Sequence, residues 1–505
     1  MCENHAIDRR RLLMTGAAVT TASALAVFEA PAADAGVRTL TRTFTGTFTG
    51  VNTPDWHYLP FRVPRGVTSI HVAYDYDKTD TGLGFSLNVI DIGIFDPSGY
   101  DLGNQAGFRG WSGGARKSFR LSRTSATPGY LPGPMTPGVW RVILGPVAIV
   151  PPGVKWKVTV TLRFGKHGPR FVPAPAPTRV AGKGAGWYRG DMHVHTVHSD
   201  GQWTQRDVAL AAKAAGLDFI GSSEHNTTSA HRTWGRHAPR DLLVINGEEV
   251  TTRAGHWIAM GLPAGSWIDW RYRPQDGKLN RFTNRVRRLG GITWACHPFV
   301  PIPSTKWDFG YDYADMDAIE IWNGPWTHDD DVTVLGWHAL LVAGRKVVGI
   351  GNSDTHHKGQ QIGLPQTVVK ADRLDVASVI AGLKAGRAWI AESKKVSLDL
   401  KAGVGTPTAT IGDSLTAGPT DLVKVQLEVS GVPGCAAQLI CATGPVGGGI
   451  ADAEGKITAT ATVPAAVARF VRAEVRRMNG VPNPNPLEGV LVGQMVALTN
   501  PIWLG

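Results

Sequence analysis

Cysteine and charged residues are both scarce in this sequence. It has four cysteines in 505 residues, and Asp, Glu, Lys and Arg make up 18% of the chain. With 43% hydrophobic residues, 61 glycines and 33 prolines, the composition excludes extended disorder and is typical of a turn-rich globular protein. Cys435 and Cys441 could pair across a hairpin, but on one continuous strand they would lie too far apart. Cys296 precedes His297 and, on a strand, would point away from it into the packed interior.

Two further features are missing: a concentrated Lys/Arg tract and, beyond the N-terminal region, a long apolar run. The formal net charge is +11, but the basic residues are dispersed, which argues against nucleic acid as a partner. A diffuse positive charge fits small anionic molecules or association with an anionic cell envelope, and it also fits solubility alone. Without a long apolar run, we expect no transmembrane segment after the N-terminal region.

The first 35 residues have the pattern of an export signal. Arg9, Arg10 and Arg11 precede a short apolar run from Gly16 to Val27, and Ala33-Asp34-Ala35 offers a cleavage site. The paired arginines are typical of a twin-arginine signal, which exports proteins that have already folded. We therefore expect residues 1–35 to be a signal peptide and the mature protein to be secreted, periplasmic or cell-wall associated.

The rest of the chain is too long for a single core. Its hydrophobic pattern changes from strand-like to alternating strand and helix, and then back to strand-like. Residues 37–165 alternate between apolar and polar positions separated by Gly/Pro turns, which predicts an N-terminal β-sandwich. Residues 166–186 form a Pro/Gly-rich linker. Residues 187–394 alternate strand and helix patterns, which predicts a parallel sheet closed or nearly closed into a barrel. Residues 395–505 return to strand patterns and predict a C-terminal β-sandwich.

The stretch around His193 and His195 suggests metal binding. The two histidines are two residues apart, so on a strand they project from the same face and can reach one ion. Asp200 follows with a carboxylate oxygen. By itself this spacing is weak evidence, because two histidines on a strand also occur as polar surface or as a hydrogen-bonded structural pair.

The other predicted strands of residues 187–394 support the interpretation that His193 and His195 bind a metal. In βα barrels the chemistry lies at the carboxyl ends of the strands, and almost every strand of residues 187–394 ends in a residue that can ligate a metal. Each residue alone has an ordinary structural explanation, but the set predicts a metal centre. Its members are His193, His195, Asp200, His225, Glu248, His256, His297, Asp354 and His356.

The order of these motifs resembles a known family. The motifs are His193-Val-His195, Ser199-Asp200-Gly201, Glu224-His225-Asn226, Gly247-Glu-Glu-Val-Thr251 with Gly255-His256, Cys296-His297-Pro298, Ile319-Glu-Ile-Trp-Asn323 and Ser353-Asp-Thr-His356. Together they resemble the PHP (polymerase and histidinol phosphatase) superfamily and, within it, the CehA/McbA-type metallohydrolases. The resemblance covers roughly residues 187–395, and the segments Arg472–Arg476 and Leu498–Ile502 resemble the tail of the same family.

The resemblance implies an α/β fold, a distorted (βα)7 barrel flanked by the two β-sandwiches, with two or three divalent metal ions. It places His193, His195, Glu248 and Asp354 around one ion. Glu248 would bridge to a second ion, held also by His256 and His297. Asp200, His225 and His356 would hold a third. Two residues depart from the family pattern: Glu224 stands where Asp is usual and would orient His225 or perturb the third site, and Asp200 replaces a His, which leaves occupancy of that site open.

These residues predict a hydrolase. Imidazole and carboxylate ligands suit zinc, manganese or iron, and the sequence does not choose among them. Such a cluster carries net positive charge and favours a small anionic substrate, so we expect a phosphoesterase that uses a metal-bound hydroxide. Arg253 could contact the phosphate, His198 could assist proton transfer, and Glu320 could face either the site or the core rim. The alternatives are a carbamate or ester hydrolase with the same site, and a non-catalytic binding protein of the cell envelope.

Overall fold

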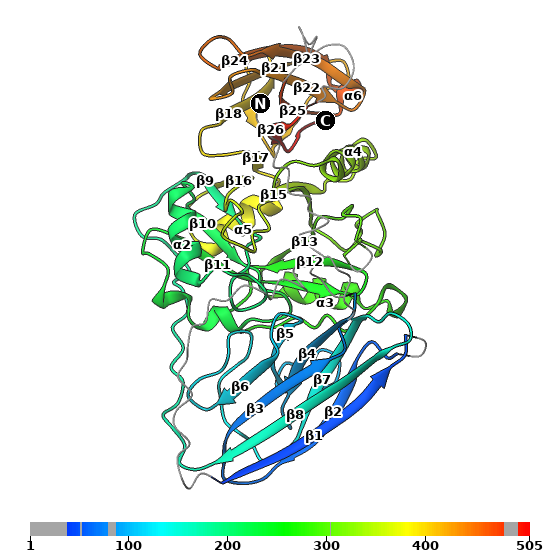
Figure 1. Cartoon of the computed structure of the whole chain (residues 1–505). Helices are drawn as coiled ribbons and strands as arrows, with labels where there is room; N and C mark the ends of the chain where they lie inside the picture. The colour runs from blue at the N-terminus through cyan, green and yellow to red at the C-terminus, as the bar shows by residue number, and fades with distance from the viewer. Residues whose placement is uncertain (1–37, 51–52, 79–86, 303–304, 479–492) are drawn as a thin grey trace, which may run out of the picture.

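The computed structural model of the chain describes residues 38–50, 53–78, 87–302, 305–478 and 493–505. The expected signal peptide, residues 1–35, lies outside them. Three regions follow one another along the long axis of the molecule, with the N-terminal strands at one end and the C-terminal strands at the other (Figure 1). Within the described residues, none of the helices combines the length and the apolar character that crossing a bilayer requires.

The N-terminal region is made of two four-stranded antiparallel sheets. In β8, a Val-Lys-Trp-Lys-Val-Thr-Val pattern places Val and Trp inside and Lys outside, as expected for strands with one covered face. Trp140 and Val158, one from each sheet, belong to the same buried core. The first sheet contains β1 (Thr39–Phe48), β8 (Val154–Phe164), β3 (Val67–Tyr76) and β6 (Ser118–Ser122). The second contains β2 (His57–Val63), β7 (Gly138–Ala148), β4 (Val89–Phe95) and β5 (Phe108–Gly113).

The central region is a curled α/β sheet. Its strands, in sheet order, are β15 (Val348–Asn352), β14 (Ala318–Asn323), β13 (Ile292–Ala295), β12 (Gly255–Met260), β11 (Leu243–Thr252), β10 (Phe219–Ser222), β9 (Gly186–Asp191), β16 (Gln366–Ala371) and β17 (Ala388–Ala391). Its helices are α2 (Gln205–Ala214), α3 (Leu279–Arg288), α4 (His328–Val342) and α5 (Val376–Lys384), with short 3-10 turns η1 (Ser229–Arg232), η2 (Trp234–Arg236) and η3 (Pro274–Asp276). The helix α2 begins after Thr204, which forms a capping box with Asp207.

The sheet is not a regular (βα)7 alternation. β9, β10 and β11 are parallel, as are β13, β14 and β15, but β12 runs antiparallel to both of its neighbours. The cause lies in the connection, because only Arg253 and Ala254 separate β11 from β12, and two residues can join antiparallel strands but not parallel ones. The two ends of the curl approach each other, since Val194 bridges Thr355 and the His195 N–H donates to the Thr355 carbonyl at 2.9 Å.

The C-terminal region shares a layer with the central sheet. β17 pairs with β26 (Met495–Thr499), and the same sheet continues through β25 (Phe470–Arg477), β22 (Cys435–Cys441) and β23 (Gly444–Ile450). A second sheet of β19 (Ala409–Thr410), β18 (Ser397–Val404), β21 (Leu422–Ser430) and β24 (Ile457–Pro464) packs on it, beside β20 (Ser414–Leu415), β27 (Ile502–Leu504) and the short α6 (Ala465–Ala468). Cys435 and Cys441 lie at opposite ends of one strand, and both thiols are free.

An aromatic cluster fixes the N-terminal region against the central one. Phe108 stacks on Trp267 with ring centroids 4.2 Å apart, and Trp111 lies 4.5 Å from Trp270. All four side chains are buried in a core that both regions share. The end of the sandwich that carries β4 and β5 therefore lies against β12 and α3 (Figure 1), next to the ends of the strands that carry the predicted ligands.

Candidate metal centre

The structure brings His193, His195 and Asp354 together. Both histidines follow the end of β9, and Asp354 follows β15 with a left-handed backbone, φ 50°. The Nε2 atoms of His193 and His195 lie 3.2 Å and 3.3 Å from the same oxygen, Oδ1 of Asp354. All three side chains are buried. We call these residues the first ligand group.

Glu249, and not Glu248, faces the histidines. The Oε2 atom of Glu249 lies 3.3 Å from Nε2 of His193 and 3.2 Å from Nε2 of His195. Glu248 points to the opposite face of β11, where its Oε2 accepts a hydrogen bond of 2.8 Å from the Ile268 N–H. The expectation that Glu248 bridges two ions is therefore wrong. Neighbouring residues of a strand face opposite sides, and the sequence offers a glutamate on each side.

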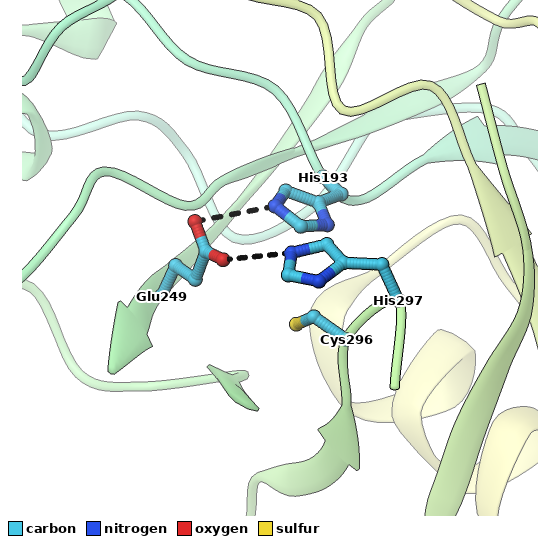
Figure 2. A group of neighbouring side chains, drawn as sticks. All are labelled: His193, Glu249, Cys296 and His297. Atoms are coloured by element: carbon cyan, nitrogen blue, oxygen red, sulfur yellow. Dashed lines mark ion pairs between the residues drawn. The ribbon is translucent and has the colours of Figure 1, made fainter. Parts of the chain in front are cut away.

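The second ligand group, Glu249, His256 and His297, gathers on the other oxygen of Glu249. Oε1 lies 2.9 Å from Nδ1 of His256 and 3.4 Å from Nε2 of His297. His256 comes from β12, opposite Thr251 in the β11–β12 hairpin, and His297 follows β13. Figure 2 shows the carboxylate of Glu249 placed between His193 and His297, one oxygen toward each ring. One carboxylate thus joins the first group to the second.

Asp200, His225 and His356 form the third ligand group. Asp200 Oδ1 lies 3.6 Å from Nε2 of His225 and 3.5 Å from Nε2 of His356, and these two nitrogens are 3.4 Å apart. The ligand atoms of these three residues and of His195 all lie within 4.8 Å of one another. On its other side, the His225 ring contacts Oγ1 of Thr251 at 2.6 Å through Nδ1. That contact fixes the ring and leaves Nε2 facing Asp200.

The atoms that face the centre lack ordinary partners. Buried polar atoms are almost always hydrogen-bonded, but five in this centre have no such partner among the described residues: His193 Nε2, His195 Nε2, Asp200 Oδ1, Glu249 Oε2 and Asp354 Oδ1. Each of these atoms can offer a lone pair to a metal, and its close neighbours are likewise imidazole nitrogens or carboxylate oxygens. A divalent cation satisfies such a set, whereas a proton would satisfy only a pair. The donor set therefore fits the metals that accept imidazole and carboxylate ligands.

The electrostatics of the centre keep its carboxylates ionised. Burial alone would raise the pKa of Glu249, but the imidazoles of His225, His193 and His256 hold that pKa well below its usual range. Burial also opposes ionisation of Asp354, and His193 and His195 again lower its pKa well below normal. Glu248 behaves oppositely, because burial raises its pKa well above the usual range. Burial therefore favours the neutral acid form of Glu248.

Glu320 faces the site. It lies on β14, and its Oε1 is 3.1 Å from Nδ1 of His193. Its carboxylate also accepts hydrogen bonds from the side-chain amides of Asn323 (2.8 Å) and Asn352 (2.9 Å) and from the His297 N–H (3.2 Å). With Nδ1 donating to Glu320, Nε2 of His193 is left free to bind a metal. Glu320 thus orients ligands from two strands.

Glu224 and Asp191 hold backbone segments in place. The nitrogens of the His225 ring face Thr251, Glu249 and Asp200, and the Glu224 carboxylate has other partners. It accepts hydrogen bonds from the Thr196 hydroxyl (2.5 Å) and the Ser199 hydroxyl (2.6 Å), and so anchors the loop that ends in Asp200. Asp191 was not predicted as a site residue, although it lies two residues before His193. It accepts from the N–H groups of Ser353 (3.1 Å) and Gly363 (2.8 Å), which fixes the segment that carries Asp354.

His198 and Arg253 lie at the rim rather than among the ligands. Burial lowers the pKa of His198 to about 4, and its Nδ1 lies 2.8 Å from the Ser229 hydroxyl. Arg253 reaches into the N-terminal region, where Nη1 lies 3.4 Å from Oδ2 of Asp91 and the guanidinium covers the ring of Trp56 at 4.8 Å. Both residues therefore link the ligand-bearing loops to their surroundings.

Comparisons with known proteins add little to this geometry. No protein-family model and no curated protein matches the chain. Among solved structures it is similar to a two-domain protein from Bacteroides vulgatus ATCC 8482 described as containing a predicted PHP-like metal-dependent phosphoesterase, with 16% identity, a TM-score of 0.33, and coverage of 66% of this chain and 100% of that one. An amidohydrolase from Chromobacterium violaceum shows 16% identity, a TM-score of 0.28, and coverage of 39% of this chain and 96% of that one. At these TM-scores, the case for function rests on the side chains.

The two adjacent glutamates give a matched test of the centre. We expect Glu249→Gln to reduce the metal content of the purified protein, because it removes the charge shared by two ligand groups. Glu248→Gln should keep the metal, since glutamine resembles the neutral acid that burial favours there. Elemental analysis after equilibration with zinc or manganese measures both. Loss of metal from Glu248→Gln alone would restore Glu248 as the bridge.

Glu320→Gln tests the orientation of His193. The substituted amide would place an N–H group against donors, so we expect metal affinity to fall about 10- to 100-fold, as is usual when a ligand loses its orienting partner. Competition with a chromogenic chelator measures the affinity. Glu428→Gln, an exposed position on β21, is the control. Equal affinities in the two variants would remove Glu320 from the centre.

Proposed function

We propose that this chain is an exported metal-dependent hydrolase, a phosphoesterase of the PHP superfamily similar to the CehA/McbA type. The observation that carries the proposal is the convergence of three ligand groups, in which buried imidazole nitrogens and carboxylate oxygens face one another and five of them lack a hydrogen-bond partner among the described residues. The intact ligand set argues against a non-catalytic binding protein, in which a disused centre would be expected to lose at least one ligand. The ligand types support zinc, manganese or iron as the bound metals, in two or three positions.

Charge supports an anionic substrate. Two or three divalent ions would outweigh the three carboxylates of Asp200, Glu249 and Asp354, and the histidines add no negative charge. When bound, such ions supply a water nucleophile at neutral pH and neutralise charge on a phosphoryl group. The residues of the chain hold the arrangement: Glu320 keeps the proton of His193 on Nδ1, and Glu224 holds the loop of Asp200. With its lowered pKa, His198 is neutral at pH 7.

Hydrolysis of model substrates tests the proposal. We expect the purified protein to contain metal and to release nitrophenol from nitrophenyl phosphate or bis-nitrophenyl phosphate. Asp354→Asn should lower kcat/KM by more than about 100-fold, since removing a ligand exceeds the effect of removing a ligand's partner. An aryl N-methylcarbamate is the comparison substrate. Hydrolysis of the carbamate alone would replace the phosphoesterase by a carbamate hydrolase, and a metal-free protein would end the enzyme hypothesis.

The proposed export rests on residues 1–35. In a bacterial host with a twin-arginine pathway, we expect N-terminal sequencing of the exported protein to begin at Gly36. Replacing Arg9 and Arg10 by lysine should retain the precursor inside the cell, because this pathway reads the arginine pair. An exported protein that still carries residues 1–35 would contradict cleavage, and export unchanged by the lysine variant would contradict the route.

A further inference from the structure

Cys296 is packed in the buried interior, as expected, but its thiol also lies beside the metal centre. Its Sγ atom and the ligand atoms of His193, Glu249 and His297 all lie within 4.8 Å of one another. Figure 2 shows the sulfur below the His297 ring, on the side from which Glu249 approaches. The side chain is fully buried, and the cysteine is free. Nothing in the proposed function gives this residue a role.

The backbone explains why two adjacent side chains reach one centre. β13 ends at Ala295, so the alternation of a strand no longer applies at Cys296. His297 then adopts a left-handed conformation, φ 29°, which is uncommon for a residue with a side chain. The turn rotates the imidazole back to the side of the thiol. Such strain costs energy and persists where the surrounding structure requires it, often at functional sites.

The neighbours of the thiol point to a ligand between them. His193 Nε2 and Glu249 Oε2 are 3.3 Å apart, fully buried, and without a hydrogen-bond partner among the described residues. A third donor, Nε2 of His297, lies 3.4 Å from Oε1 of the same carboxylate. A sulfur within reach of two imidazoles and a carboxylate completes the mixed set that tetrahedral zinc accepts.

We propose that Cys296 binds, as a thiolate, the ion held by Glu249 and His297, and that this ligand makes the position select zinc over manganese. The inference rests on the proposed metal centre and adds to it a ligand and a metal preference. Soft thiolate ligands favour zinc, whereas carboxylate and imidazole sites accept manganese as well. On binding, the Sγ–H bond breaks, the sulfur donates its electron pair to the ion, and the proton leaves to solvent.

Cobalt(II) reports the bond directly. It replaces zinc in such sites, and a thiolate ligand adds an intense sulfur-to-cobalt charge-transfer band in the near ultraviolet that oxygen and nitrogen ligands do not give. The chain has four cysteines, so a variant with Cys2, Cys435 and Cys441 all changed to Ser keeps Cys296 alone. We expect this variant to show the band. Adding Cys296→Ser should abolish it while the weaker visible bands of bound cobalt remain.

A second measurement tests the metal preference. After equilibration of the full chain with equal concentrations of zinc and manganese, we expect Cys296→Ser to lower the ratio of bound zinc to manganese at least about tenfold. Cys296→Ala serves as a second variant in case serine binds through its hydroxyl. Cys441→Ser, a buried thiol in the C-terminal region, should leave the ratio unchanged.

The outcomes separate this inference from the proposed function. Cobalt bound with visible bands but no charge-transfer band, in the variant that keeps Cys296, would show that the thiol only packs against the centre; phosphoester hydrolysis could persist, and only the inference would fail. An unchanged zinc-to-manganese ratio in both Cys296 variants would overturn the preference. No bound cobalt in any variant would overturn the metal centre and the inference together.

Discussion

The carboxylate of Glu249 is the constraint around which the centre is built. It is fully buried, and its two oxygens lie within 3.4 Å of imidazole nitrogens from His193, His195, His225, His256 and His297. Burying a charge without compensation costs several kcal/mol, so these rings must surround the carboxylate together. Four separate strands or turns meet at one side chain to provide them. The curl of the sheet follows from this convergence, because a flat sheet would hold the same residues too far apart.

The ligands that lie just past strand ends could be anticipated from the sequence, because strand ends on one edge of a sheet gather in space. The grouping of His193 with Asp354 and of His225 with His356 came from the resemblance to the PHP superfamily, and the structure places both pairs side by side. Two features could not be anticipated. Glu248 and Glu249 are chemically identical neighbours, and only the register of β11 decides which one faces inward. Cys296 lies in the interior, as strand alternation indicated, but its closeness to the ligands could not be anticipated, because the strand stops one residue earlier and His297 turns the chain. The antiparallel direction of β12 was also not predicted. The connection between β11 and β12 is only two residues long, and so short a turn has no sequence pattern that identifies it.

The N-terminal region also supports the rim of the centre. Asp91 holds Arg253, which lies between the ligands Glu249 and His256 in the chain, and Arg116 donates a hydrogen bond to the Val197 carbonyl in the loop before Asp200. The Gly129 N–H donates to the Ser229 hydroxyl at 3.1 Å, and Ser229 in turn contacts His198. These contacts join residues distant in sequence, so composition and periodicity gave no sign of them. The β-sandwich is therefore part of the structure that fixes the ligand loops, and not only an appended module.

The pairing of β17 with β26 sets the order in which the molecule can be completed. Trp389 and Ile390 pair with Thr499 and Leu498, and Asn500 donates to the Ala388 carbonyl at 2.9 Å while accepting from the Gly349 N–H at 2.8 Å. Gly349 belongs to β15, the strand that leads to Asp354. During synthesis the N-terminal sandwich can form as soon as it emerges, but the edge of β17 stays open until β26 has been made. The strand that leads to Asp354 therefore gains its full support only once β26 and Asn500 have been added.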